Sequence, residues 1–155
     1  MRDAVVVEAV RTPVGRHKGA LAQVHPVDML THTINALVER SGVDQALIED
    51  VITGTVTQVT EQGANIGRIA GLVANLPPTV PGMTLNRMCS SSQQAIHMAA
   101  QGVIAGDMDL VIACGVESMT RVPMGSEWGH WGQSIEEKYE QISQGIAAER
   151  MVADY

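Results

Sequence analysis

The segment TLNRMCSSSQQAIHMAAQGVIAG, residues 84–106, changes character at a single cysteine. The apolar run TVPGMTL (79–85), which ends just before Cys89, is typical of a β-strand. After Cys89 the apolar residues recur at helical spacing, and Gly106 is a typical helix stop. The residues predicted for the apolar face of this helix are Ala95, Ile96, Ala99, Ala100, Val103 and Ile104. The segment therefore predicts a strand-to-helix junction with Cys89 at or just before the first helical turn.

Strands and helices alternate on both sides of this junction. Further strands are predicted at 4–10 (AVVVEAV), 50–56 and 109–119, and the first is apolar enough for a strand buried on both faces. A helix is predicted from Pro26 to a stop at Gly42. The alternation from residue 4 to residue 119 predicts an α/β domain with a mostly parallel sheet.

Another helix is predicted in the segment GANIGRIAGLVANLPP (63–78), which ends in two prolines. Its apolar stripe is predicted to contain Ile66, Ile69, Ala70 and Val73. Glycines at 63, 67 and 71 lie four residues apart and indicate close packing of this helix against a neighbour. Neither the dinucleotide-binding fingerprint nor the P-loop pattern is present in the sequence.

The character of the sequence changes after Met119. The segment TRVPMGSEWGHWGQS (120–134) is irregular, and residues 135–155 are polar with a helical pattern. We therefore predict a domain boundary near residue 120, with an α/β domain over 1–119 and the beginning of a second, incomplete domain over 120–155. Trp128, His130 and Trp131 are interpreted as surface residues of this second part, with a ligand-binding role as the less favoured alternative.

Composition narrows the class of protein. The chain has 155 residues, 45% of them hydrophobic, which is enough for one core. The formal net charge is −7 and no Lys/Arg cluster is present, which argues against nucleic acid as a partner. The sequence has no apolar run long enough to span a membrane and no signal-peptide pattern. Two cysteines form no disulfide framework, and we expect a reduced, cytoplasmic protein without metal or cofactor.

The two cysteines are interpreted differently. A free cysteine is most often a small buried hydrophobe, but Cys89 falls where a strand ends and a helix begins. Sites in α/β sheets are built at that end of the strands, and a helix N-terminus stabilises anions such as a thiolate. The position of Cys89 therefore supports two interpretations equally: a small buried hydrophobe and a nucleophile. Cys114 lies inside the apolar run LVIACGV (110–116), which favours a structural thiol in a strand.

Four motifs carry a resemblance to a known family. In chain order they are EAVRTPVGRHKGAL (8–21), NRMCSSSQQAI (86–96), AAQGVIAGDMDLVIACGVESMTRVPMG (99–125) and GIAAERMVADY (145–155). Together they resemble the N-terminal domain of thiolases, the acetyl-CoA acetyltransferase and 3-ketoacyl-CoA thiolase family. One departure is that the usual Cys-Gly-Ser-Gly-Leu-Gln reads Cys-Ser-Ser-Ser-Gln-Gln at 89–94, a variant more similar to degradative than to biosynthetic thiolases.

The resemblance implies a fold, a reaction and a site residue. It implies the N-terminal half of a thiolase fold, with 120–155 as the start of the loop domain that covers coenzyme A. It implies thiolytic cleavage of a 3-ketoacyl-CoA, or the reverse Claisen condensation, through an acyl intermediate on Cys89. The backbone N–H of Cys89 is implied to help bind the thioester oxygen. The implied partners are acyl-CoA and CoA as substrates, and a homo-oligomer, a dimer or tetramer, at full length.

Two catalytic motifs of the family, Gly-His-Pro and Cys-x-Gly, do not occur in these residues. His97, eight residues after Cys89 on the same predicted helix, would lie roughly 12 Å away along the helix axis, too far to replace the missing histidine. We therefore expect the chain to be a truncated thiolase that is inactive alone. The alternatives are one subunit of a split thiolase, a non-catalytic thiolase-derived interaction module, and a relative of β-ketoacyl synthases, against which VESMTRVPM and NRMC argue.

Overall fold

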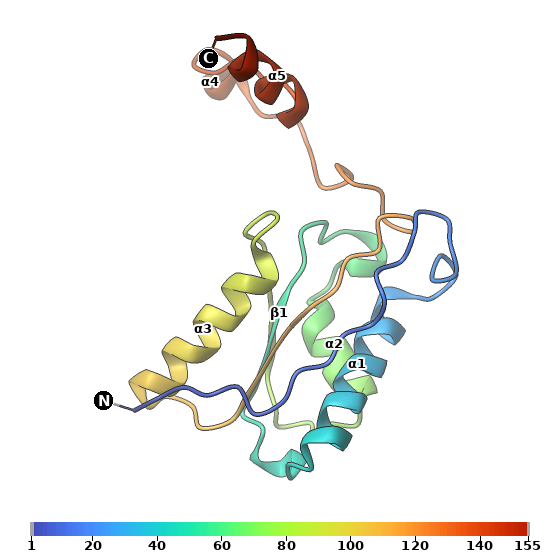
Figure 1. The fold of residues 1–155 in the computed structure, drawn as a ribbon, viewed down its shortest axis with the longest axis vertical. Coiled ribbons are helices and arrows are strands. Elements are labelled where there is room, and N and C mark those ends of the chain that lie inside the picture. Colours follow the sequence, from blue (N-terminus) through green and yellow to red (C-terminus); the bar gives the residue numbers. More distant parts are fainter. Residues whose placement is uncertain (1, 155) are drawn as a thin grey trace.

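A three-stranded parallel sheet with helices on both faces forms the centre of the computed structural model, which describes residues 2–154 (Figure 1). The central strand β1 (Asp50–Gly54) lies between β2 (Gly82–Leu85) and β3 (Val111–Gly115). Both outer strands are parallel to β1. The predicted α/β class and parallel sheet are confirmed, although each of these strands is shorter than its predicted range.

Three helices flank the sheet, and their ends follow local signals. Helix α1 (Pro26–Ser41) begins at its proline and is followed by Gly42, whose φ of 66° is left-handed, as predicted. Helix α3 (Ser91–Ala105) stops at Gly106, with a φ of 86°. Helix α2 (Ile66–Val73) begins three residues later than predicted, because the Asn65 side chain accepts a hydrogen bond from the Arg68 N–H and caps it there. Two short 3₁₀ turns, η1 (Gln45–Leu47) and η2 (Thr60–Gln62), flank β1.

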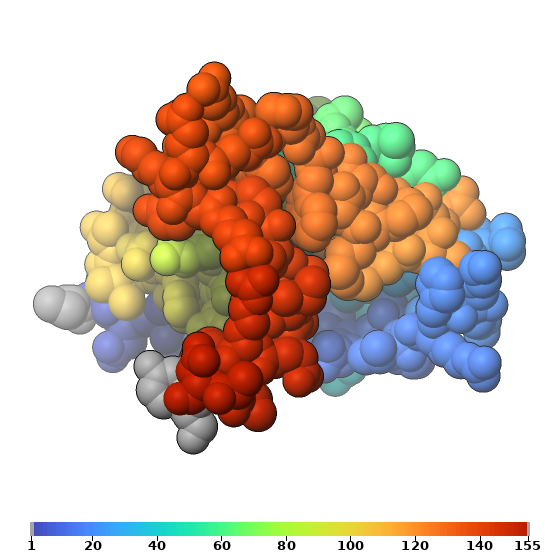
Figure 2. All heavy atoms as spheres, turned by 90° about the horizontal axis from the view of Figure 1, so that it is seen from above, coloured from blue at the N-terminus to red at the C-terminus, as the bar shows by residue number. Residues whose placement is uncertain are grey.

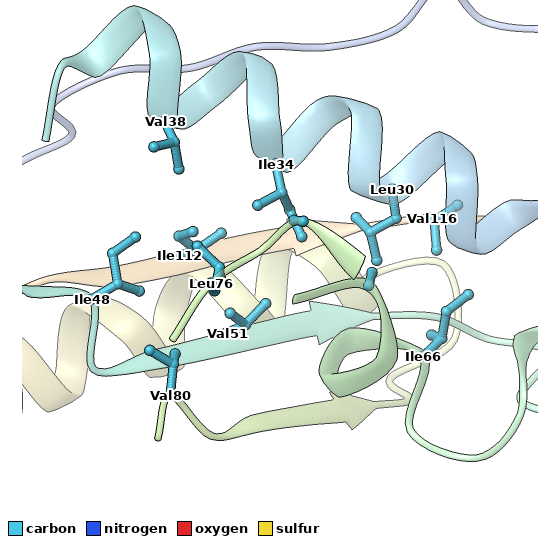
Figure 3. Packing of buried hydrophobic residues seen from close by; sticks show 12 residues of the cluster. Leu30, Ile34, Val38, Ile48, Val51, Ile66, Leu76, Val80, Ile112 and Val116 are labelled. Atoms are coloured by element: carbon cyan, nitrogen blue, oxygen red, sulfur yellow. The ribbon is translucent and has the colours of Figure 1, made fainter. Parts of the chain in front are cut away.

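The sheet has an apolar core on each face, because successive residues of a strand point to opposite sides. Val51 of β1 belongs to the larger core, which α1 and α2 cover, and Ile52 belongs to the smaller one beneath α3. Figure 3 shows the apolar side chains of α1 pointing towards the sheet. The buried residues of the larger core are Leu30, Ile34, Val38, Ile48, Val51, Ile66, Ala70, Ala74, Leu76, Val80, Ile112 and Val116.

Helix α2 packs closely on the sheet, as its glycine spacing predicts. A Cβ atom added at Gly67 would lie 2.5 Å from Thr53 Oγ1 and 2.8 Å from the Met83 carbonyl oxygen. Gly63 lies outside the helix. The predicted burial of Val73 is wrong, since its exposed fraction is 49%. At this end of α2 the buried face is made by small residues instead: Ala70, Gly71 and Ala74.

The prediction of a buried strand at residues 4–10 is wrong. This segment forms no strand, and Val5 and Val6 are 78% and 80% exposed. This segment lines a hollow of about 1060 Å³, together with residues of β3, α1 and α3. An apolar run becomes a strand only where a neighbouring backbone lies within hydrogen-bonding distance, and the described sheet of β2, β1 and β3 does not include this segment.

The predicted apolar face of α3 needs a second correction. The predicted apolar face of α3 is buried at Ala95 and Ala99, but Ile96 and Ile104 are 52% and 42% exposed. Ile96 lines the hollow instead of packing against the sheet.

The C-terminal part extends away from the sheet. Helix α4 (Gln133–Glu136) and helix α5 (Gln144–Asp154) lie apart from the sheet in Figure 1, and Figure 2 shows this part, in red, passing above the rest of the chain. The helical pattern predicted over 135–155 is thus interrupted at residues 137–143, and Tyr155 lies outside the described residues. The domain boundary near residue 120 stays a prediction.

Candidate functional site

Cys89 lies in a tight turn between β2 and α3. The turn is closed by hydrogen bonds from Ser90 N to the Arg87 carbonyl oxygen (3.1 Å) and from Ser91 N to the Met88 carbonyl oxygen (3.0 Å). Met88, directly before the cysteine, has a φ of 50°, a left-handed conformation that is uncommon for a residue with a side chain. The turn leaves Cys89 exposed, immediately before Ser90, the N-cap residue of α3. The predicted strand-to-helix junction is therefore present at Cys89.

Two glycines bring the beginning of α3 onto the sheet. Gly54 and Gly115, the last residues of β1 and β3, lie opposite each other in the sheet. A Cβ at Gly54 would lie 2.2 Å from Ser92 N, and one at Gly115 would lie 1.8 Å from Ser92 Oγ. The absence of side chains at these glycines thus lets the N-terminus of α3 contact the carboxyl ends of the strands. That end of a parallel sheet is where binding and catalytic sites are commonly built.

One of the three serines after Cys89 holds the turn together. Ser91 is buried, and its hydroxyl accepts a hydrogen bond from Arg87 N (2.9 Å) and donates one to the Met88 carbonyl oxygen (2.6 Å). Ser90 occupies the N-cap position but makes no capping hydrogen bond with its side chain. Helix α3 has 15 residues and carries a partial positive charge at its N-terminus. Because Cys89 directly precedes the N-cap residue, this charge favours an anion there.

Asn86 connects this turn to the loop after β1. Its side-chain amide donates to the Val56 carbonyl oxygen (3.0 Å), and its Oδ1 accepts from Met88 N (2.7 Å). Asn86 and the two glycines, Gly54 and Gly115, are parts of the site that were not predicted from the sequence, and neither was the role of Ser91 in closing the turn. Asn86 and Ser91 lie within three residues of Cys89, so the turn residues around the predicted junction are the signal that could have indicated them.

Cys114 lies in β3 beside Thr53 of β1, as a structural thiol would. The residue as a whole is only partly buried, but burial of the thiol raises its pKa to about 11. A hydrogen bond of 3.1 Å with Thr53 Oγ1 opposes this rise in the pKa. Both cysteines are free, and the raised pKa makes Cys114 a poor nucleophile near neutral pH.

The structure brings no general base to Cys89 in residues 2–154. None of the hydrogen bonds among these residues involves the Cys89 Sγ atom, and His97 is an exposed residue further along α3.

Trp128 and Trp131 are exposed in the segment before α4, and His130 there lies 3.7 Å from Glu136. The described part of the chain contains no group of three metal-binding side chains. Between residues 2 and 154 none of the helices has the length and apolar character needed to cross a membrane.

Comparison with known families gives a match over nearly the whole chain. The family model for the thiolase N-terminal domain matches residues 4–155. A steroid 3-ketoacyl-CoA thiolase of Mycobacterium tuberculosis is 44% identical over 126 residues, which cover 81% of this chain and 31% of the relative. A beta-ketoadipyl-CoA thiolase of Acinetobacter baylyi is 45% identical over 148 residues, covering 94% of this chain and 36% of the relative.

A 3-ketoacyl-CoA thiolase of Serratia proteamaculans is 46% identical over 126 residues, covering 80% of this chain and 33% of the relative. The chain thus spans about a third of the length of the curated relatives that it matches.

Proposed function

This chain belongs to the thiolase family, and we propose that it supplies the acyl-carrying cysteine, Cys89, of a CoA-dependent acyltransferase. The observation that carries the proposal is the position of the thiol: exposed, in a turn with a left-handed residue, at the N-terminus of α3 and beside the carboxyl ends of β1 and β3. The names of the relatives support 3-ketoacyl-CoA compounds as the substrate class.

The proposed reaction consists of two acyl transfers. The Cys89 thiolate attacks the 3-keto carbon, a bond forms between Sγ and that carbon, and the bond between the α- and β-carbons breaks. The leaving carbanion takes a proton and departs as acetyl-CoA, and the shortened acyl group stays on Cys89 as a thioester. The thiol of a second CoA then attacks this thioester and releases the acyl group. Because one thioester replaces another, the intermediate is neither deeply stable nor very high in energy.

The N-terminus of α3 would serve this chemistry by favouring negative charge. The backbone N–H of Cys89, together with the partial positive charge of the helix, would stabilise both the thiolate and the oxyanion that forms during attack. The side chains that move protons are not supplied by the described residues around Cys89. We therefore propose that this chain, alone, does not catalyse steady thiolysis. From membership of the thiolase family and from the two free cysteines, respectively, we also propose that the whole protein is a homo-oligomer and that it works in the cytoplasm.

The proposal is tested by incubating the chain with acetyl-CoA and measuring its intact mass. We expect a single acetyl group, located on Cys89 by peptide mapping, that is absent from Cys89→Ala and present on the control Cys114→Ala. Steady release of CoA-thioester products from acetoacetyl-CoA, lost in Cys89→Ala, would contradict the proposed inactivity of the chain. A chain that is never acylated at Cys89, even with the remaining part of a thiolase added, is a binding module and not an acyl carrier.

A further inference from the structure

A carboxylate in the loop after β3 joins the loops that follow β1 and β3. Glu117 Oε2 accepts a hydrogen bond from Val56 N (2.8 Å), and its Oε1 accepts from Thr57 N (3.3 Å) and from Gln62 Nε2 (2.7 Å). Glu117 lies in the VESMTRVPM motif, for which the proposed chemistry gives no role. Hydrogen bonds to a charged acceptor are about twice as strong as neutral ones, so this carboxylate is well suited to fix the backbone of the β1 loop.

Gln62 completes the link between the two loops. Its side chain is fully buried, and its amide donates to the Thr57 carbonyl oxygen (2.9 Å) as well as to Glu117. Its Oε1 accepts a hydrogen bond from Ser118 N (2.6 Å). Both polar ends of a buried side chain are therefore satisfied, which makes this arrangement costly to change.

The same loop reaches the Cys89 turn through one residue. Val56 donates its N–H to Glu117 and accepts, at its carbonyl oxygen, the hydrogen bond from Asn86. Asn86 in turn accepts from the N–H of Met88, the left-handed residue before Cys89. A continuous series of hydrogen bonds thus runs from Glu117 through Val56 and Asn86 to the backbone that presents the cysteine.

We propose that Glu117, acting through Val56 and Asn86, is a positioning residue for the Cys89 thiol. The left-handed conformation of Met88 is unfavourable by itself and persists only where its surroundings hold it. The hydrogen bond from Met88 N to Asn86 Oδ1 helps to stabilise this conformation, and Glu117 fixes the loop to which Asn86 is bound. Loss of the carboxylate therefore releases the turn and moves the thiol from the N-terminus of α3.

The test is the rate of Cys89 alkylation by iodoacetamide in the 155-residue chain, followed by peptide mass spectrometry. Replacing Glu117 with Gln leaves one acceptor oxygen where there were two, so at least one of the three N–H groups loses its acceptor. We expect Cys89 to react at least about threefold more slowly. Removing a negative charge would by itself favour a thiolate and speed the reaction, so the sign of the effect separates positioning from simple electrostatics. The inference rests on the proposed role of Cys89, but alkylation reports on the thiol even if no acyl group is ever transferred.

Glu49→Gln is the matched control. Glu49 Oε2 accepts hydrogen bonds from Asp109 N and Leu110 N, and so also joins the β1 and β3 segments, but at the opposite end of the strands. We expect Glu49→Gln to leave Cys89 alkylation unchanged. An equal slowing in Glu49→Gln and Glu117→Gln would overturn the proposal, because it would show a general loss of stability.

The exposed Asn86 provides a second test, and the single variant Asn86→Ala does not depend on the folding of Glu117→Gln. Asn86→Ala should slow alkylation by a similar factor, and Asn86→Ala combined with Glu117→Gln should be no slower than the single variants, because both interrupt the same series. Wild-type reactivity of Asn86→Ala, or factors that multiply in the double variant, would refute the coupling.

Discussion

Replacing Gly54 with alanine tests directly how the Cys89 site is assembled. The new methyl group would lie 2.2 Å from Ser92 N, 2.3 Å from the Ser91 carbonyl carbon and 2.6 Å from the Ser91 oxygen. All three are backbone atoms, so no side-chain rotation relieves the contact. The N-terminus of α3 must move away from the sheet, or β1 must shift within it.

The expected cost is at the upper end of overpacking effects, about 3 kcal/mol of unfolding free energy. For a chain of this size each kcal/mol corresponds to roughly 2–4 °C, so the melting temperature should fall by about 6–12 °C. Because the displaced helix end carries Cys89, alkylation of this thiol should slow as well. Circular dichroism melts and iodoacetamide kinetics measure the two effects.

Gly71→Ala is the control, since it also adds one methyl group to a buried glycine. Its Cβ would lie 3.6 Å from Leu76 Cδ1 and 3.7 Å from Val51 Cγ2, which are ordinary contacts. Alanine is favoured over glycine in a helix by about 0.5–1 kcal/mol, so we expect an unchanged or slightly higher melting temperature. If Gly54→Ala melts like the wild type and keeps its Cys89 reactivity, the contact between α3 and the strand ends is not as described.

Three further predictions concern ionisable groups. At pH 8 a pKa of about 11 leaves roughly one in a thousand Cys114 thiols ionised, so iodoacetamide should modify Cys89 far faster, and equal rates in the native chain would contradict this. Burial raises the pKa of the Cys114 thiol from 9.0 to about 11, so between these pH values the unfolded state loses the thiol proton before the folded state does. The free energy of unfolding is therefore unaffected below pH 9 and falls as the pH rises to 11. Urea melts should show this loss, on the order of 2–3 kcal/mol, and Cys114→Ala should lack it. Hydrogen bonds from Arg121 lower the pKa of Glu61 below 4.5. The contribution of this pair to the free energy of unfolding is therefore present at neutral pH and is lost as the pH falls through the lowered pKa. Arg121→Gln should therefore flatten the acid side of the stability profile, and an unchanged acid side would show that the pair contributes nothing.

Local signals allowed much of the fold to be predicted. Pro26 and Gly42 bound α1 because proline suits a first helical turn and glycine adopts the left-handed C-cap. The junction at Cys89 follows from the change of hydrophobic period between residues 84 and 106. The strand predicted at 4–10 is wrong because a strand depends on a neighbouring backbone, and the sequence pattern does not show that this segment lines a hollow and lies outside the described sheet.

The candidate site was predicted only at its cysteine. Glu117 reaches Val56 across 61 residues, and Gln62 reaches Ser118 across 56, so no local pattern indicates these hydrogen bonds. Gly54 is conspicuous only once β1 is placed against the start of α3. Residues that position a reactive group by contacts between distant loops require the tertiary structure, whereas the reactive group itself stands at a recognisable change of secondary structure.

Cys89 is proposed to accept an acyl group and to give it back to CoA as a thioester. The most direct measurement is to acetylate the chain with acetyl-CoA, remove the excess reagent, add free CoA and follow the intact mass. We expect the acetyl group on Cys89 to be lost as acetyl-CoA forms, because one thioester exchanges for another. An acetyl group that resists CoA, as an amide on a lysine would, or one that is located on Cys114, would contradict the proposed role of Cys89.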